Sequence, residues 1–407
     1  MKTSSTHLPS LFGSLLFLLG AVFGLGAALL LGIVALSRGL VGGSFDARET
    51  IVFMVVAFEG VLLLAAAVIS IQKFLHIPSA DRDTSYTISP WQIGVCILLA
   101  GLALLLGHLI TDNPSVNWLL LPILTLPAVF LPILLLLGLG VRRIPLGTRW
   151  MAWNVLGLSM TLVPFVLFIL EIIVLFLILI LVAFFAVSQP QIVAEMERIT
   201  SQIYMMGPSP DPEVMLEMFA PFLLKPGVIG ISLVYIAVLV PMMEELIKPL
   251  GVWLFGNQLQ SPAQGFALGA LSGAAYALVE TFGVSPQTTD WAAMLLSRVG
   301  TGLLHVTTSA LMGGAIALAI RERRYLRLLG TYLLAVSLHG LWNASAIFYT
   351  FSNLASYLER TGSLTRFSPP IVVGMTILSA VLLAILVLSN RRMRDKAPGP
   401  ASNEPPV

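Results

Sequence analysis

The sequence predicts an all-α protein, a polytopic bundle of transmembrane helices. Hydrophobic residues make up 57% of the 407 residues and charged residues only 10%, against roughly 25% charged in an average soluble domain. The mean hydropathy is +0.94. A helix that rises 1.5 Å per residue needs about 20 apolar residues to cross a bilayer, and about ten stretches of this chain reach that length. We therefore expect a multi-pass protein of the cell membrane, in contact with the lipid bilayer.

The ten expected spans differ mainly in length. They are Leu11 to Leu36, Ile51 to Phe74, Trp91 to Ile110, Trp118 to Leu139, Met151 to Val187, Gly227 to Phe255, Gln264 to Phe282, Trp291 to Ile320, Tyr325 to Phe351 and Ile371 to Leu388. The first is longer than the apolar core of a signal peptide and lacks a cleavage site of small residues, which favours a transmembrane helix. The fifth is too long for one upright span. It is expected to tilt, to kink at Pro164 or to begin along the interface.

Basic residues indicate the orientation. They cluster in Arg142-Arg143 with Arg149, in Arg321 to Arg327, and in Arg391 to Lys396. With ten spans and both termini in the cytoplasm, all three clusters fall on the cytoplasmic side, as the positive-inside rule requires. A net charge of +2 is too balanced to suggest nucleic acid as a partner. The single Cys96 excludes an intrachain disulfide and a cysteine-based metal cluster.

Composition divides the chain into five regions. They are an N-terminal transmembrane region of about five spans (1–187), an acidic extracytoplasmic loop (188–226), a four-helix core (227–351), a last span (352–390) and a basic, disordered cytoplasmic tail (391–407). The acidic loop is expected to be partly helical. The tail has the composition of a disordered segment.

Four later spans each carry an ionisable residue with a second polar residue four positions away. The pairs are Glu244 with Lys248, Tyr276 with Glu280, His305 with Ser309, and His339 with Asn343. Residues at this spacing share one helix face. The acids and histidines of the four pairs lie roughly 16 to 24 Å from the cytoplasmic helix ends. Because charge is costly in hydrocarbon, such groups usually face a protein interior or a watery cavity.

Two backbone features favour bringing these helices together. Pro241 cannot donate a hydrogen bond to the carbonyl of Ala237, so the helix is expected to bend just before Glu244. Gly265, Gly269 and Gly273 form two overlapping Gly-xxx-Gly steps, which let a helix pack closely against a neighbour. The second feature would bring Glu280 near its partners.

The chemistry that this set suggests is hydrolysis by an activated water. A glutamate in low dielectric can act as a general base near neutral pH, and imidazole and amide N–H groups can hold a developing oxyanion. Two glutamates and two histidines can instead bind a divalent metal such as zinc. The sequence lacks the His-Glu-x-x-His signature. Both mechanisms stay open, as do an ion pair of the glutamates with Lys248 and helix-bridging roles for the histidines and Asn343.

These residues resemble the motifs of a known family. The motifs are Pro-x-x-Glu-Glu-x-x-Lys at Pro241 to Lys248, Tyr-x-x-x-Glu at Tyr276 to Glu280, the helix with His305-Val-Thr-Thr-Ser309, and His339-Gly-Leu-Trp-Asn343. Together they resemble the four motifs of PrsW-type intramembrane proteases, relatives of the CAAX prenyl endopeptidases and of bacteriocin-processing enzymes. The resemblance covers about Val228 to Tyr349. The chain departs from it with Tyr276 where Phe is usual, and with Thr281 where Asn commonly follows the glutamate.

The resemblance implies an intramembrane endopeptidase that cleaves a membrane-anchored protein, similar to proteases that clip anti-sigma factors. It implies that Glu244 activates water and that Glu245 supports it. Glu280 and His305 would complete the water or metal site, and His339 with Asn343 would stabilise the oxyanion. If a metal is bound, its expected ligands come from Glu244, Glu280, His305 and His339. The family is commonly described as metalloproteases, whereas the related prenyl endopeptidases are similar to metal-free glutamate enzymes.

Two functions of other classes compete with a protease. A proton-coupled transporter also uses mid-membrane glutamates and histidines, as a proton relay. It would be expected to show inverted repeats, and none is obvious in the sequence. A receptor or scaffold that uses an inactive relative of the fold is the third reading, and loss of Glu244 or His339 would have favoured it. Both residues are present.

Overall fold

The computed structural model describes residues 7–206, 211–286, 290–358 and 364–394. It confirms the all-α fold class, with one small addition, an antiparallel pair of short strands. Nine helical stretches among the described residues are long and apolar enough to cross a membrane. The last thirteen residues of the expected tail lie outside the described part. The chain forms two compact units, made of Met1–Phe165, Glu245–Ala335 and Ser379–Val407, and of Val166–Glu244 and Val336–Leu378.

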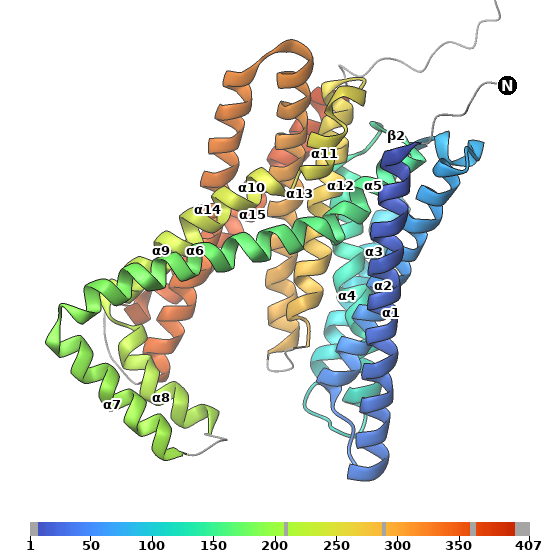
Figure 1. Ribbon diagram of the computed structural model, residues 1–407. Helices are drawn as coiled ribbons and strands as arrows, with labels where there is room; N and C mark the ends of the chain where they lie inside the picture. Colours follow the sequence, from blue (N-terminus) through green and yellow to red (C-terminus); the bar gives the residue numbers. More distant parts are fainter. Residues whose placement is uncertain (1–6, 207–210, 287–289, 359–363, 395–407) are drawn as a thin grey trace, which may run out of the picture. The chain divides into compact units, whose positions relative to one another are not determined.

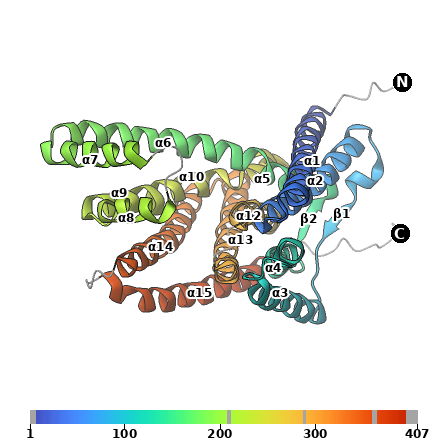
Figure 2. The same ribbon diagram turned by 90° about the horizontal axis from the view of Figure 1, so that it is seen from below.

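The first unit contains the most deeply buried helices. Its elements are α1 (Leu8–Gly42), α2 (Ala47–Phe74), β1 (Asp83–Ser85), α3 (Pro90–Ile110), α4 (Asn117–Gly140), β2 (Pro145–Thr148), α5 (Arg149–Met160), α11 (Leu250–Leu254), α12 (Pro262–Val284), α13 (Trp291–Glu322) and the latter part of α15 (Ser368–Arg394), with short 3-10 turns at Pro78–Asp81 and Gly256–Gln258. In Figures 1 and 2, α12 and α13 run side by side, and Figure 2 shows α3 beside α4. In the most apolar 18-residue stretch of α12, 78% of the residues are buried, and in the corresponding stretch of α13, 83% are buried.

The second unit carries the predicted acidic loop and the helix with Glu244. Its elements are most of α6 (Leu162–Val187), α7 (Pro190–Met206), α8 (Pro212–Leu223), α9 (Pro226–Val234), a π-helical turn at Tyr235–Leu239, the start of α10 (Val240–Ile247), most of α14 (Tyr325–Tyr357), a 3-10 turn at Leu364–Phe367 and the start of α15. The expected loop is therefore largely helical. Its two ends are joined by an ion pair between Lys225 and Glu195.

The expected spans are not all single, strongly apolar helices. The fifth breaks at Thr161, between α5 and α6, three residues before the expected kink at Pro164. The reason is that proline lacks an N–H and its ring clashes with the carbonyl four residues earlier, here Met160. The ninth expected span is helical within α14, but it is not among the nine apolar stretches because polar residues such as His339 and Asn343 interrupt its apolar face.

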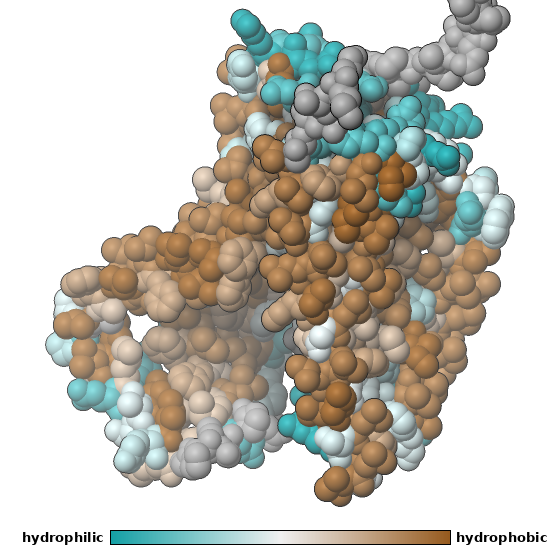
Figure 3. Space-filling view, turned by 45° about the vertical axis from the view of Figure 1, so that its right-hand side comes forward, coloured by the Kyte–Doolittle hydropathy of each residue, from teal (hydrophilic) through white to brown (hydrophobic). Residues whose placement is uncertain are grey.

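The outer surfaces suit a lipid environment. Large apolar side chains such as Phe23, Phe168, Phe184 and Leu326 are well exposed, and Figure 3 shows hydrophobic residues over most of the visible surface. Four of the polar residues named as candidates, Glu244, Glu245, His305 and His339, are buried instead. This inversion of the soluble pattern confirms a multi-pass membrane protein.

Candidate active site

In the first unit, glycine packing holds the two central helices together. A Cβ placed on Gly265, Gly269 or Gly273 of α12 would run into the backbone carbonyl of Gly313, Ser309 or His305 of α13. Only glycine allows backbones to approach this closely. The close packing expected from the Gly-xxx-Gly steps is confirmed, and it places α12 directly against the turn of α13 that carries His305.

Both ring nitrogens of His305 have partners. Its Nε2 lies 2.6 Å from Oε2 of Glu280 on α12, and its Nδ1 lies 2.9 Å from Nζ of Lys248. An ammonium group has only donors, so Nδ1 accepts and the ring proton belongs on Nε2, which donates to the carboxylate. The His305 side chain is 1% exposed. The structure thus assigns one tautomer to a buried imidazole from its hydrogen bonds alone.

Lys248 is a fully buried cation at the centre of this network. Its Nζ lies 2.5 Å from Oε1 of Glu245 and 5.6 Å from the centre of the Tyr276 ring, which itself meets the His305 ring edge to face. An ion pair of Lys248 with the glutamates, one of the alternatives that the sequence left open, is present to Glu245, three residues away. A buried ammonium needs such a partner, because desolvating a lone charge is costly. Tyr276 packs against the network.

The end of the glutamate helix is fixed through its backbone. The hydroxyl of Ser272 on α12 donates to the carbonyl oxygen of Lys248 at 2.5 Å, and the hydroxyl of Ser159 on α5 lies 2.7 Å from that of Ser272. Lys248 is followed by Pro249, and the helix α10 ends at Ile247. A terminal carbonyl has lost its helical partner, so a side-chain donor is needed there. Through Ser159, the N-terminal region takes part in holding the network.

Glu280 has a second partner that the sequence analysis did not single out. Its Oε2 lies 2.8 Å from Nη2 of Arg298, whose Nε lies 3.4 Å from the hydroxyl of Thr281. Arg298 precedes His305 by seven residues, two helical turns, so both project from the same side of α13. An arginine inside an apolar helix is itself a signal that sequence analysis can use.

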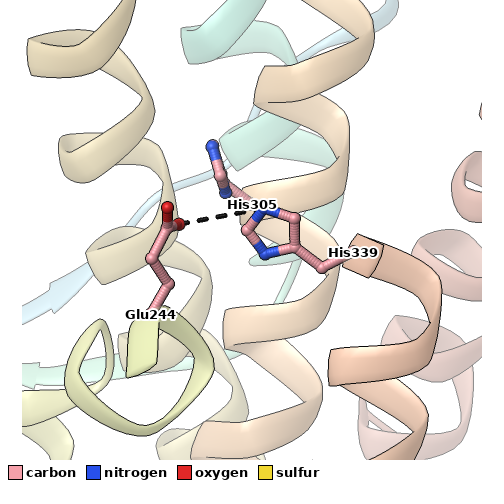
Figure 4. A group of neighbouring side chains, drawn as sticks. All are labelled: Glu244, His305 and His339. Carbon is pink, nitrogen blue, oxygen red and sulfur yellow. Dashed lines mark ion pairs between the residues drawn. The ribbon is translucent and has the colours of Figure 1, made fainter. Parts of the chain in front are cut away.

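In the second unit, one acid faces one imidazole. Oε2 of Glu244 lies 3.9 Å from Nε2 of His339, and Figure 4 marks this ion pair with a dashed line. Their side chains are 8% and 2% exposed. The distance is longer than a hydrogen bond.

A π-helical turn and Asn343 shape the backbone before Glu244. The N–H of Val240 donates to the carbonyl of Tyr235, five residues back. If that pattern continued, the carbonyl of Ile236 would need an N–H from Pro241, which has none. The side-chain amide of Asn343 donates to this carbonyl at 2.9 Å. The distortion expected at Pro241 is present, and it involves Ile236 rather than Ala237.

The six expected site residues therefore lie in three local groups. Glu245, Glu280 and His305 belong to the network of the first unit, Glu244 meets His339 in the second unit, and Asn343 contacts the backbone of Ile236. All these residues have interactions with neighbouring groups. The helix-bridging alternative for Asn343 has a direct contact in its favour.

A multi-pass helical membrane protein with paired glutamates and histidines is compatible both with an intramembrane hydrolase and with a proton-coupled transporter. The comparison with family models identifies which one: residues 162–383 match the PrsW family of intramembrane metalloproteases. The match covers more than half of the chain, and the chain belongs to this family. It begins earlier than the resemblance suggested, at the start of α6, so part of the fifth span lies inside it. Neither the curated proteins nor the solved structures contain a match.

Proposed function

We propose that this PrsW-family protease hydrolyses a peptide bond in a membrane-anchored protein and that Glu244 is its central catalytic group. The observation that supports this most is the buried pair of Glu244 with His339 at 3.9 Å. A carboxylate shielded from bulk water can take a proton from a water molecule. Membership in a metalloprotease family decides against the transporter and the scaffold.

Glu244 and Glu245 are neighbours in the chain although they belong to different units. Glu244 ends one stretch of the second unit and Glu245 begins a stretch of the first. One trans peptide bond holds their Cα atoms about 3.8 Å apart. The network of Glu245, Lys248 and His305 is therefore tied covalently to the residue beside Glu244. Successive helical residues point about 100° apart, so the two glutamates can serve different partners.

A metal ion is the second way in which we propose that this protease activates water, and the resemblance gives its ligands as Glu244, Glu280, His305 and His339; Figure 4 draws three of these side chains. Carboxylates and imidazoles are the ligands that zinc hydrolases use. Ligands of a tetrahedral zinc ion at about 2.0 Å lie roughly 3.3 Å apart, and the 3.9 Å between Glu244 and His339 is longer than that separation. The chemistry of the donor set fits. A bound divalent ion would supply Lewis acidity and lower the pKa of a water molecule.

The other residues have supporting roles in this proposal. Glu245 is held by Lys248 and keeps that cation beside His305. Glu280 orients the His305 ring through Nε2. Asn343 uses one N–H on the carbonyl of Ile236, and an amide has a second N–H that can face an oxyanion. His339 is the second donor for that charge when no metal is bound.

The test uses the purified protein in liposomes with a mixed set of single-span membrane peptides, with new termini read by mass spectrometry. Wild type, Glu244→Gln and a chelator-treated sample run in parallel. Glu59→Gln is the matched control, because Glu59 is another intramembrane acid, on α2. New termini in wild type and Glu59→Gln that vanish in Glu244→Gln are expected. Loss under chelator and return with added zinc would support the metal, whereas cleavage by Glu244→Gln at the wild-type rate contradicts the proposal.

A further inference from the structure

We propose that Arg298 is a positioning residue of this protease: through Glu280, it holds the His305 ring with Nε2–H bound and the Nδ1 lone pair turned toward a cation. The metal part of this inference rests on the proposed function. The part that concerns the His305 ring rests only on contacts within the first unit. Arg298 lies outside the four sequence motifs.

One carboxylate oxygen joins two turns of α13. Oε2 of Glu280 contacts both Nη2 of Arg298 at 2.8 Å and Nε2 of His305 at 2.6 Å. The two residues of α13 lie seven positions apart, about 10.5 Å along the helix axis. Glu280 reaches both because α12 is held against α13 by its glycines. The position of this oxygen therefore depends on Arg298 and the position of the His305 ring depends on this oxygen.

The three side chains in this series of contacts differ in burial. The Glu280 side chain is 35% exposed, that of Arg298 16% and that of His305 1%. A full positive charge near a partly exposed carboxylate favours one position of that carboxylate. The guanidinium is planar and donates from several nitrogens, so a second contact limits its rotation. Here Nε of Arg298 has a long contact to Thr281 at 3.4 Å.

The opposite nitrogen of His305 already faces a cation. Nδ1 accepts from the ammonium of Lys248 at 2.9 Å, and Lys248 also holds Glu245. A metal that binds His305 through Nδ1 would take the place of the ammonium on that nitrogen, while Lys248 keeps its ion pair with Glu245. An imidazole whose other N–H binds a carboxylate is the arrangement that raises ligand basicity in metal sites. Arg298 and Glu280 would supply that arrangement before any metal binds.

The first readout needs neither metal nor substrate. Protein with ¹⁵N-labelled histidine rings is prepared in detergent or nanodiscs, and the His305 signal is assigned by its loss in His305→Gln. In wild type, we expect a low-field Nε2–H proton that exchanges slowly with water and an unprotonated Nδ1. In Arg298→Gln, we expect this proton to move upfield and to exchange faster. Arg327→Gln is the charge-matched control, because Arg327 is exposed on α14, and it should leave the signal unchanged.

The second readout is zinc affinity, measured by competition with a chelating dye. Loss of an outer partner of a metal-ligating histidine typically weakens metal binding about 10- to 100-fold. We expect that range for Arg298→Gln, a smaller loss for Arg298→Lys and no change for Arg327→Gln. Zinc affinity within twofold of wild type in Arg298→Gln would contradict the metal part.

The outcomes separate this inference from the proposed function. A wild-type His305 signal in Arg298→Gln overturns the positioning role, whatever the protease activity. If wild type neither binds zinc nor cleaves peptides, the proposed function fails, yet the exchange of the Nε2 proton still decides the role of Arg298. If Arg298→Gln cannot be recovered folded, Arg298→Lys decides: faster exchange supports the guanidinium contacts, and wild-type exchange contradicts them.

Discussion

The two units hold their candidate catalytic groups in different ways. In the first unit, Glu245, Lys248, His305, Glu280 and Arg298 form an uninterrupted series of contacts between 2.5 and 2.9 Å. In the second, Glu244 and His339 stand 3.9 Å apart on helices shaped by a backbone distortion. Short contacts in a network fix the positions of its groups. From this comparison, we propose that the first unit orients and that Glu244 and His339 of the second unit react.

The strongest test of this division compares the adjacent glutamates. We expect Glu244→Gln to lower the rate of peptide cleavage by about 10²- to 10⁴-fold, the range that a general base contributes. For Glu245→Gln, we expect less than about a tenfold loss per folded molecule, because glutamine still accepts a hydrogen bond from Lys248. The rates are measured in liposomes, and the folded fraction is measured by size-exclusion chromatography. Equal losses in the two variants would break the division between reacting and orienting groups.

The network of the first unit is expected to stabilise the folded protein. Lys248→Met leaves the buried Glu245 carboxylate without its ammonium partner, and loss of one partner of a buried ion pair costs about 3–5 kcal/mol. The free energy of unfolding is measured by titration with SDS in mixed micelles. Replacing both partners, as Glu245→Leu with Lys248→Met, should recover much of this loss. If the double variant is less stable than Lys248→Met alone, the broken ion pair is not the main cause of the lower stability of Lys248→Met.

The close packing of α12 against α13 is also expected to stabilise the first unit. Gly273→Ala puts a methyl group against the carbonyl of His305, and overpacking of this kind typically costs about 1–3 kcal/mol. Gly283→Ala is the matched control on the same helix, since a Cβ there meets no atom within 4 Å. We expect Gly273→Ala to unfold at lower SDS than wild type and the control to match wild type or exceed it. Equal behaviour of both variants would argue against close packing at Gly273.

The smallest expected effect concerns the backbone distortion of the second unit. Asn343→Ala removes the donor to the carbonyl of Ile236, at a cost of about 1 kcal/mol. Pro241→Ala restores an N–H that can satisfy the same carbonyl, so the cost of Asn343→Ala should shrink in that background. A double-mutant cycle on unfolding free energies measures this coupling. Additive effects would show that Asn343 acts independently of Pro241.

The sequence by itself determined the fold class and most of the candidate residues. Apolar length predicts helices because lipid offers no partner for backbone groups, and buried acids and histidines stand out because their charge is costly there. The glycine steps correctly predicted close helix packing, because that effect depends only on the missing Cβ. Pro241 likewise predicted a distortion, since the missing N–H is a local property.

The tertiary structure alone decided which groups meet. The spacing allowed an ion pair of Lys248 with a glutamate, but it could not show that the same ammonium also contacts His305 on α13. Arg298 became part of the network only when α12 placed Glu280 between two turns of α13. Helical periodicity fixes which residues share a face of one helix. Contacts between helices depend on packing and on the rotation of each helix, which a single sequence does not encode locally.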